Sequence, residues 1–302
     1  MSITQLNTLK FKEEIHQTFD VLLPEIFINN GPDKQDYQLL FSIVDQISVD
    51  EIESFRAAMQ PILNPGTIIG FSFTKPFGYN GDFFIIEKIY QNYVSPDPRY
   101  KKWDEFFHTF PAAIAVVNRK KLAKDILYQL HADTTNIRGN VLILGSGPVT
   151  EVYEFLSENP ETRLDFDLID LDKRAIDYAK AKNRKFLHRM DFFNCNIIRF
   201  TPDKTYDLIW SAGLFDYFKD KHFVYLLKKY YEYLNPGGEM IIGNFASGNP
   251  SRKIMEILGD WFLVHRSPDE LKNFALQAGI PPSKIEVASE PLGINLFLRL
   301  RK

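Results

Sequence analysis

The stretch that decides the fold is Val141-Leu142-Ile143-Leu144-Gly145-Ser146-Gly147-Pro148-Val149-Thr150-Glu151. Four apolar residues run into a glycine turn and an amphipathic segment follows, which predicts a buried parallel strand, a tight loop and the start of a helix. Gly145 and Gly147 let the backbone approach a ligand where a Cβ atom would collide. Pro148 suits the first turn of a helix, because its missing N–H would be unpaired there. A glycine-rich turn from strand to helix is the usual nucleotide-binding crevice of an open α/β sheet.

The segments after this turn alternate between strand and helix patterns. Residues 164–170 form the next predicted strand, and its last residue, Asp170, lies 25 positions after Gly145. An acid roughly 20 residues after such a loop is typical of one that binds ribose hydroxyls. The remaining predicted strands are one ending at Met190-Asp191-Phe192, then Tyr206–Ser211, Glu239–Gly243, Ile285–Ser289 and Ile294–Leu300.

The order of these features resembles class I S-adenosylmethionine (SAM) dependent methyltransferases over about residues 138–302. The features that follow the family's order are the glycine loop, the acid of the second strand, the acid after the third strand and the turn before the fifth strand, Leu234-Asn235-Pro236-Gly237-Gly238. The resemblance implies a seven-stranded Rossmann-like α/β sheet whose last strand is antiparallel. It also implies SAM as the cofactor, with the glycine loop facing its methionine part, Asp170 its ribose, and Asp191 with Phe192 its adenine. The residues expected at SAM are Gly145, Ser146, Gly147, Glu151, Asp170, Leu171, Asp191, Phe192, Ser211, Gly213, Tyr79 and Asp82.

Two positions depart from the family pattern. Leu144 stands where many members carry an acid before the first glycine, and Val149 stands where many carry a third glycine. Glu151 and Asp216 are both candidates to bind the SAM amino group in place of that acid. A nicotinamide dehydrogenase would be expected to carry G-x-G-x-x-G. The third glycine of that motif would fall at position 150, where this chain has threonine, so the sequence favours the methyltransferase interpretation over a dehydrogenase.

Composition narrows the class of protein. The chain has 302 residues with 45% hydrophobic and 25% charged content, which is typical of a soluble globular protein. The net charge, 36 − 39 = −3, argues against a nucleic-acid partner, which usually meets a basic excess. Cys195 is the one cysteine and the six histidines are scattered, so we predict no disulfide and no metal site. The sequence shows neither a signal peptide nor an apolar run long enough to span a membrane, so we expect a cytoplasmic protein.

The N-terminal part has a different pattern. Residues 1–64 show helical periodicity, including Phe11, Ile15 and Phe19, and an irregular loop with two glycines follows over residues 74–83. A helix predicted to open at Phe110 carries Arg119. We therefore predict a helical cap or substrate domain over 1–137 and the SAM domain over 138–302, with the loop and the helix around Arg119 closing over SAM as a lid.

Several segments narrow the resemblance to one methyltransferase subgroup, whose members are described as bacterial 3-hydroxy fatty acid methyl ester synthases of quorum sensing. One departure is Val117, where the subgroup is expected to carry arginine. The segments that carry this resemblance are Lys75–Asp82, Ala115–Arg119, Ser211–Tyr217, Gly243–Phe245, Asn249–Arg252 and Asp260–Phe262.

The acceptor decides which side chains the chemistry needs. A carboxylate is already ionised at pH 7 and needs donors, for which Arg119, Arg266, Tyr79 and Asn244 are candidates. A hydroxyl or amine needs a base within hydrogen-bond reach, for which Asp216, Asp82 and His265 are candidates, with Tyr217 beside Asp216. The sequence thus predicts a SAM-dependent methyltransferase acting on a small carboxylic acid, in its narrowest form a 3-hydroxy fatty acid. The alternatives are N- or O-methylation, or another SAM-using transfer or cyclisation, on an amino acid or natural-product scaffold, and a SAM sensor without catalysis.

Overall fold

The computed structural model describes residues 22–133 and 138–302, and their contacts divide into two compact units. The sheet unit comprises residues 82–90, 114–249 and 263–302. The helical unit comprises residues 1–81, 91–113 and 250–262. The contacts therefore divide the chain differently from the single boundary predicted at 137/138, which lies inside a segment of the sheet unit.

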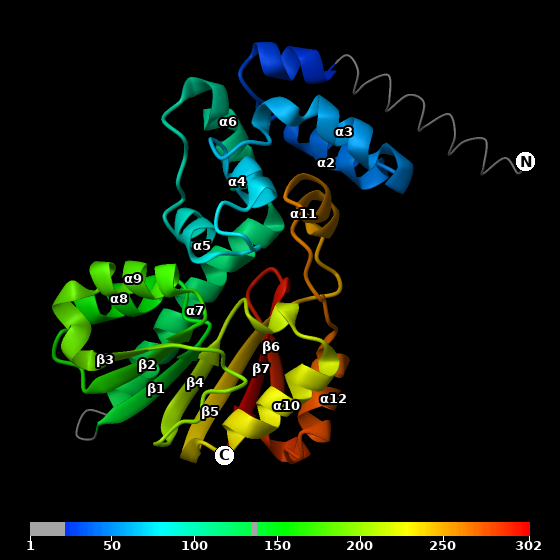
Figure 1. The fold of residues 1–302 in the computed structure, drawn as a ribbon. Coiled ribbons are helices and arrows are strands. Elements are labelled where there is room, and N and C mark those ends of the chain that lie inside the picture. Colours follow the sequence, from blue (N-terminus) through cyan, green and yellow to red (C-terminus); the bar gives the residue numbers. More distant parts are fainter. Residues whose placement is uncertain (1–21, 134–137) are drawn as a thin grey trace, which may run out of the picture. The chain divides into compact units, whose positions relative to one another are not determined.

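The sheet unit is built on seven strands in the order β3-β2-β1-β4-β5-β7-β6 (Figure 1). β1 to β5 are parallel to one another, and β7 runs antiparallel to both β5 and β6. The predicted Rossmann-like fold with an antiparallel last strand is confirmed. The strands are β1 (Gly139–Leu144), β2 (Leu164–Asp170), β3 (Met190–Asn194), β4 (Tyr206–Ser211), β5 (Leu234–Phe245), β6 (Ile285–Ser289) and β7 (Asn295–Arg301).

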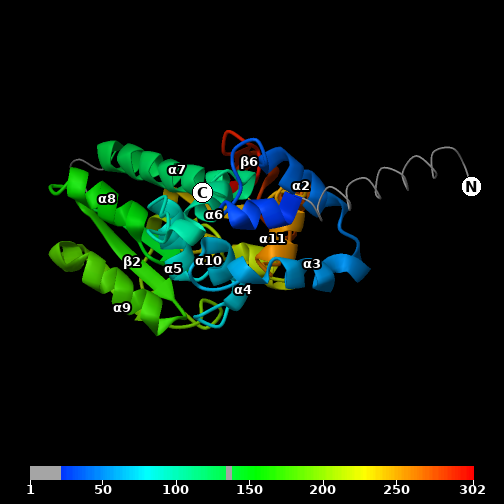
Figure 2. The ribbon, with the colours of Figure 1, turned by 90° about the horizontal axis from the view of Figure 1, so that it is seen from above.

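Helices cover both faces of this sheet, because its central strands are apolar on both sides. One core contains residues of α7 (Pro111–Asp133), α8 (Thr150–Glu158) and α9 (Lys173–Lys182), and α8 lies between the other two in Figure 2. The opposite core contains residues of α10 (Asp220–Tyr231) and α12 (Pro268–Gln277). The sheet unit also contains α5 (Phe83–Tyr90), η3 (Arg184–Arg189), η4 (Phe215–Tyr217) and η5 (Pro282–Lys284).

The helical unit packs around aromatic side chains. Phe106 lies 5.3 Å from Phe41 and 5.0 Å from Phe110, measured between ring centroids. The predicted periodicity at Phe11, Ile15 and Phe19 lies outside the described residues. The unit contains a helix over 22–28, α2 (Tyr37–Gln46), η1 (Val49–Glu51), α3 (Ile52–Ala58), η2 (Gln60–Ile62), α4 (Ile68–Thr74), α6 (Pro98–Phe107) and α11 (Arg252–Leu258).

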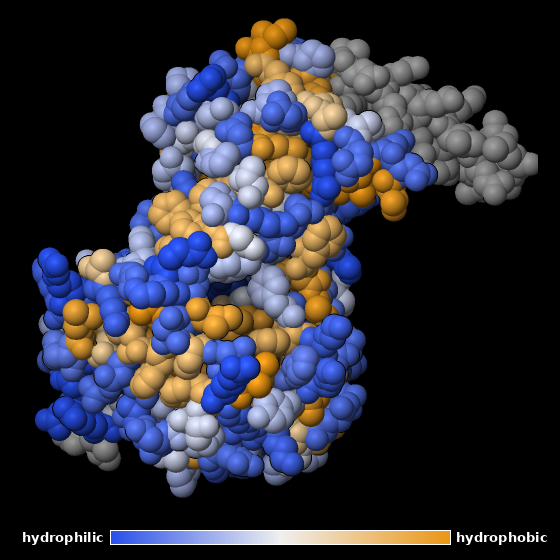
Figure 3. All heavy atoms as spheres, in the orientation of Figure 1, coloured by the Kyte–Doolittle hydropathy of each residue, from blue (hydrophilic) through white to orange (hydrophobic). Residues whose placement is uncertain are grey.

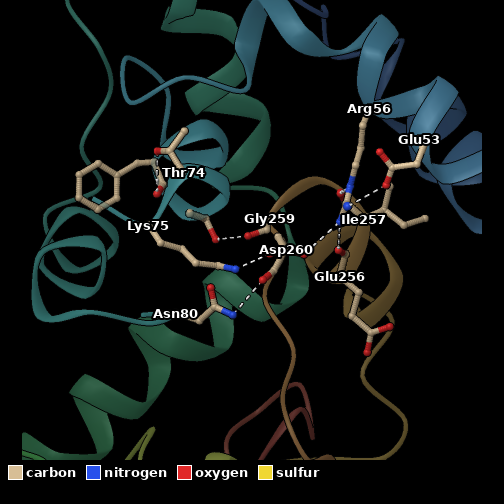
Figure 4. Close-up of polar contacts among 11 residues, drawn as sticks. Glu53, Arg56, Thr74, Lys75, Asn80, Glu256, Ile257, Gly259 and Asp260 are labelled. Carbon is tan, nitrogen blue, oxygen red and sulfur yellow. Dashed lines mark hydrogen bonds and ion pairs between the residues drawn. The ribbon is translucent and has the colours of Figure 1, made fainter. Parts of the chain in front are cut away.

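Within the helical unit, Asp260 joins segments that are far apart in the sequence (Figure 4). Its carboxylate binds the ammonium of Lys75 and, at 3.1 Å, the guanidinium of Arg56. Its carbonyl accepts a hydrogen bond from Nδ2 of Asn80 at 2.8 Å. Arg56 also donates to two carbonyl groups at the end of α11. These contacts fix residues 250–262 to α3 and to the irregular loop after α4.

Hydrophilic and hydrophobic residues are interspersed on the face shown in Figure 3. Among residues 22–133 and 138–302, we find no helix with the length and apolar character that a bilayer crossing requires.

Candidate active site

The glycine loop leaves the carboxyl end of β1 at the centre of the sheet. Gly145 and Gly147 both adopt left-handed φ angles, +67° and +55°, which favour glycine. A Cβ atom on Gly145 would lie 2.9 Å from Cδ2 of Leu214, whereas a Cβ on Gly147 would meet nothing within 4 Å. The Ser146 hydroxyl is buried and has no hydrogen-bond partner among the described residues. The loop therefore presents open space and one unused polar group.

Asp170 lies beside this loop at the end of β2. Its Oδ2 accepts the backbone N–H of Gly147 at 2.8 Å, and its Oδ1 accepts that of Asp172 at 2.9 Å. Burial raises the pKa of the Asp170 carboxyl, although these two N–H groups oppose the rise. The carboxylate thus fixes the loop and lies where the ribose-binding acid was predicted.

The end predicted for the third strand was wrong. Asp191 and Phe192 are the second and third residues of β3 and do not follow it, since Asp191 pairs with Asp167 and the strand continues to Asn194. Asn194 is paired with Asp170, and its Nδ2 donates to the carbonyls of Asp170 and Leu171 at 3.0 and 2.9 Å. Asn194 therefore occupies the strand end at which the adenine-binding pair was expected.

Val149 takes the place of a third glycine in an unfavourable conformation. Its φ is +56°, which a β-branched residue rarely adopts, and its side chain is fully buried. Burial of the valine in the core beside α8 offsets the backbone strain. The loop thus keeps a left-handed residue at this position without having a glycine there.

A buried polar cluster lies next to the loop. Arg119 on α7 is 4% exposed, Glu151 in the first turn of α8 is 6% exposed, and Asp216 is 1% exposed. The Arg119 guanidinium lies against Gly213, where a Cβ atom would be 2.8 Å from its Nη1. Its Nε donates to the Tyr90 hydroxyl at the long distance of 3.4 Å. Among the described residues no carboxylate lies within ion-pair distance of Arg119.

Burial changes the protonation of these groups. Burial raises the pKa of Asp216 to about 6, against the opposing effects of the Phe245 N–H, Arg119 and Arg266. It also raises the pKa of Glu151 and takes that of Tyr90 to about 12. A carboxyl with a pKa near the working pH is suited to accept a proton.

A second polar group attaches α5 to the rest of the sheet unit. Glu87 is 2% exposed and accepts hydrogen bonds from Lys182 at 2.6 Å and from the Thr150 hydroxyl. Lys182 also donates to the Thr150 hydroxyl at 2.7 Å. α5 therefore supports the first turn of α8, directly after the glycine loop, and it supplies Tyr90 to Arg119. The sequence analysis missed both Glu87 and Tyr90.

Arg266 and Asn244, both predicted to bind an acceptor carboxylate, bind each other instead. Nη1 of Arg266 donates to Oδ1 of Asn244 at 2.7 Å, and Nη2 donates to the Phe218 carbonyl at 2.6 Å and to Asp220 at 2.9 Å. The guanidinium lies 4.8 Å from the centre of the Phe223 ring. Both residues are buried, and only Nε of Arg266 has no partner among the described residues. Their contacts are those of a structural pair.

The other predicted residues are distributed over both units. Ser211 is buried and its hydroxyl donates to the Leu144 carbonyl at 2.8 Å, so it joins β4 to β1. Asp82 is buried and accepts the N–H groups of the first turn of α5. Both ring nitrogens of His265 are engaged, one with the Leu263 carbonyl and one with Asn249. Tyr217 and Leu171 are exposed in the sheet unit, and Tyr79 is exposed in the helical unit.

Comparison with known proteins identifies the central part of this unit. Residues 141–238 match a family model described as a methyltransferase domain. Residues 141–238 are therefore similar to methyltransferase domains, and we call this segment the methyltransferase domain. The match begins in β1 and ends within β5, so the methyltransferase domain includes the glycine loop, Asp170, Asn194 and Asp216. Arg119, Glu87 and Tyr90 lie outside the matched part.

The relatives of this domain align with only part of the chain. The alpha N-terminal protein methyltransferase 1 of Dictyostelium discoideum is 31% identical over 114 residues, which are 37% of this chain and 41% of the relative. The chain thus spans about two fifths of the length of the curated relative it matches. Two solved structures share the fold. A possible exported protein from Bordetella parapertussis has a TM-score of 0.61 at 14% identity, with 73% of this chain and 79% of the other covered. A putative O-methyltransferase from Nostoc punctiforme has a TM-score of 0.51 at 16% identity, with 80% and 70% covered.

The residues of the methyltransferase domain fit SAM. Open space beside Gly147 leaves room for a ligand, and the unused Ser146 hydroxyl offers it a hydrogen bond. The carboxylate of Asp170 lies at the strand end, where ribose hydroxyls bind in such sheets. Asn194 lies beside Asp170, and because its Nδ2 is bound to the Asp170 and Leu171 carbonyls, its Oδ1 is the amide atom that can accept a hydrogen bond from a base.

Proposed function

We propose that this protein transfers a methyl group from SAM to a small-molecule acceptor. The observation that carries the proposal is the contact of Asp170 with the Gly147 N–H within the matched methyltransferase domain. The Dictyostelium relative acts, by its name, on protein N-termini, but its similarity is restricted to 114 residues. It therefore supports methyl transfer and does not identify the acceptor.

SAM supplies a methyl group on a positively charged sulfur, which makes the methyl carbon open to attack. The chain's own residues hold the reactants in line and exclude water, and alignment of this kind supplies much of the acceleration. The glycine loop, Asp170 and Asn194 are proposed to hold the cofactor. The residues after β4, which include Gly213 and Asp216, are proposed to lie on the acceptor side.

The described residues favour a hydroxyl or amine acceptor. Such a group loses a proton during transfer, and Asp216, with a pKa of about 6, is largely ionised at neutral pH and can accept it. The donors of Arg266 that would have held a carboxylate are instead bound to Asn244, Phe218 and Asp220. We therefore propose O- or N-methylation with Asp216 as the base.

A carboxylate acceptor, with a 3-hydroxy fatty acid as its specific form, is the second candidate. It is favoured by Arg119, a buried guanidinium with no carboxylate within ion-pair distance among the described residues. In that case Arg119 would grip the acceptor and no base would be needed.

The test is release of S-adenosylhomocysteine from SAM by the purified protein with a panel of acceptors, followed by mass spectrometry of the product. The panel contains 3-hydroxypalmitate, aromatic and aliphatic hydroxy compounds, and primary and secondary amines. A methyl ester would favour the second candidate, and a methyl ether or methylamine the first. Failure of the protein to bind SAM would overturn the proposed function. A SAM sensor would bind SAM and release no S-adenosylhomocysteine with any acceptor.

A further inference from the structure

We propose that Arg266 is a positioning residue for Asp216: it fixes η4, which carries Asp216, and its positive charge favours the ionised carboxylate that accepts a proton. This inference rests on the proposed function, in which Asp216 is the base for a hydroxyl or amine acceptor. Arg266 then acts on the reaction without touching the acceptor. The residues that carry the argument all belong to the sheet unit.

Arg266 binds the backbone on both sides of Asp216. Its Nη1 donates to the Phe215 carbonyl at 3.3 Å, and its Nη2 donates to the Phe218 carbonyl at 2.6 Å. Asp216 is the middle residue of η4, so these two carbonyls flank it in the chain. A 3₁₀ helix of one turn has poor internal hydrogen-bond geometry. The position of η4 therefore depends on donors outside it, and Arg266 supplies two of them.

The backbone next to Arg266 completes the frame around Asp216. The Arg266 N–H donates to the Phe245 carbonyl at 2.9 Å, and the Phe245 N–H donates to Oδ1 of Asp216 at 2.6 Å. The Val264 N–H donates to the Asp216 carbonyl at 2.8 Å. Asn244 accepts Nη1 of Arg266 at 2.7 Å, and its Nδ2 binds the carbonyls of Phe245 and Val264. Asp216 is thus bound by the two segments that Arg266 joins.

The charge of Arg266 is buried and incompletely paired. Arg266 is 1% exposed, whereas the side chain of Asp220, its ion-pair partner at 2.9 Å, is 66% exposed. Water screens the charge of an exposed carboxylate, so Asp220 compensates the buried guanidinium only in part. The remaining positive charge stabilises other anions nearby. Asp216 is such a group, because it is buried and lies on the segment that Arg266 binds.

Arg266 shares the electrostatic part of this role with Arg119. Burial raises the pKa of Asp216, and the Phe245 N–H, Arg119 and Arg266 oppose that rise. Arg119 also opposes the rise in the pKa of the buried Glu151, so it acts on two carboxyls. Arg266 differs because it also binds the backbone that carries Asp216. Other charged or titratable side chains on the adjoining segments are Tyr217 on η4, His265 beside Arg266, and Lys219 and Lys221 at the start of α10.

Two substitutions separate the positioning of η4 from the charge. Arg266→Lys keeps the charge and loses the planar fork that reaches two carbonyls. Arg266→Gln loses the charge and keeps an amide donor. A residue with a merely structural role would change stability or maximal turnover, and it would leave the titration of Asp216 as it is in wild type.

The experiment follows the Asp216 carboxyl carbon by NMR titration of the full chain, and it measures the pH dependence of turnover with the acceptor that the panel identifies. The carboxyl signal is the one that is missing from Asp216→Asn. In Arg266→Gln we expect the titration to move to higher pH by about 0.5–1 unit, because an opposite charge is lost. Turnover relative to wild type should then be about twofold to fivefold lower at about pH 6 than at about pH 8.

In Arg266→Lys the titration should stay within about 0.2 pH unit of wild type, because the charge is retained. Maximal turnover should fall by about threefold to tenfold, because the base is less well positioned. Arg301→Gln removes one positive charge from exposed ion pairs of the same unit. It is the control for the loss of charge and should leave both the titration and the turnover curve unchanged.

Asp220→Asn supplies a test that leaves Arg266 and its stabilising contacts in place. The new amide keeps an oxygen for Nη2 and removes the partial counter-ion. Asp216 should therefore titrate at lower pH by about 0.2 unit, in the direction opposite to that of Arg266→Gln. Asp177→Asn, which removes an exposed acid of α9, is the matched control and should leave the titration unchanged.

The proposal is overturned if Asp216 titrates as in wild type in both Arg266→Gln and Asp220→Asn, or if Arg266→Lys and Arg266→Gln move the titration equally. A titration that moves in Arg266→Gln without a parallel move of the turnover curve would show that Asp216 is not the base, and the proposal would fall with it. If wild type released no S-adenosylhomocysteine with any acceptor, the proposed function would fail. The titration would still show whether Arg266 acts on the Asp216 carboxyl.

Discussion

The backbone N–H of Gly147 donates to Oδ2 of Asp170 across a distance of 2.8 Å. This contact joins the loop after β1 to the end of β2, the two segments that the sequence singled out. Asp170 therefore has two tasks, since it holds the loop in shape and is proposed to bind the ribose.

The two tasks of Asp170 are separated by substitution. Asp170→Asn retains an oxygen that can accept the Gly147 N–H, whereas Asp170→Ala removes it. We expect Asp170→Ala to weaken SAM binding by at least about tenfold and to lower the melting temperature, and Asp170→Asn to weaken binding with a smaller loss of stability. Calorimetry and thermal unfolding measure the two effects. Asp177→Ala, which removes an exposed acid of α9, is the control, and wild-type SAM affinity in Asp170→Ala would contradict the site.

Gly145 is predicted to be intolerant of a side chain. Its φ is +67°, and an added Cβ would lie 2.9 Å from Leu214 Cδ2. Gly145→Ala should lower the free energy of unfolding by about 1–2 kcal/mol through the left-handed backbone and the contact. Gly248→Ala is the matched control, because nothing lies within 4 Å of its Cβ position. Thermal unfolding of the two variants measures the difference. If both were equally stable, neither the left-handed φ of Gly145 nor its contact with Leu214 would explain a need for glycine there.

Arg266 is expected to matter for stability. Replacement by methionine keeps an apolar stem but leaves Oδ1 of Asn244 and the Phe218 carbonyl without the donor they have in wild type. We expect Arg266→Met to lower the free energy of unfolding by about 3–5 kcal/mol, as for removal of one partner from a buried charged network. Arg301→Met, at a residue in exposed ion pairs, should cost about 1 kcal/mol or less. If Arg266→Met were as stable as wild type but did not bind the acceptor, the result would instead support the predicted role of Arg266 in binding an acceptor carboxylate.

Asp216 should make stability depend on pH. Its pKa in the folded protein is about 6, above the ordinary 3.8 expected in the unfolded chain. Between about pH 4 and pH 6 the folded state keeps a proton that the unfolded state has lost, so the free energy of unfolding falls as pH rises through this window. Asp216→Asn cannot ionise and should therefore be more stable relative to wild type at pH 7.5 than at pH 4.5.

The same variant tests the proposed base. Wild-type turnover should rise as pH increases through about 6, and Asp216→Asn should be slow at every pH. Turnover by Asp216→Asn at the wild-type rate would exclude Asp216 as the general base, whatever the effect of the substitution on stability. A stability difference that is the same at both pH values would exclude the pKa argument.

The fold could be predicted from local patterns because a parallel sheet with buried central strands leaves a strong signal. Runs such as Val141–Leu144 and Leu164–Asp170 are apolar and end at glycine or an acid, and both became strands with the expected neighbours. β3 was mispredicted because its residues do not alternate clearly, so the sequence did not show that the strand continues past Phe192 to Asn194.

The site was harder to predict than the fold, because it depends on contacts between distant segments. Arg266 and Asn244 are chemically suited to bind a ligand, and only tertiary structure shows that they bind each other. Glu87 lies on a short apolar helix more than 60 residues before Thr150, with no motif around it. Asp170 and Gly147 lie close together because adjacent parallel strands end at the same edge of the sheet, which the strand order alone determines.

The order of segments limits how this chain can be cut and recombined. A fragment beginning at residue 138 would lose Glu87, leaving Lys182 without its buried carboxylate, and would retain residues 250–262 without Arg56 and Lys75. Exchange of the helical unit between related chains would have to move residues 1–81, 91–113 and 250–262 together. In a gene these are three separate blocks, so a single crossover cannot transfer this unit whole.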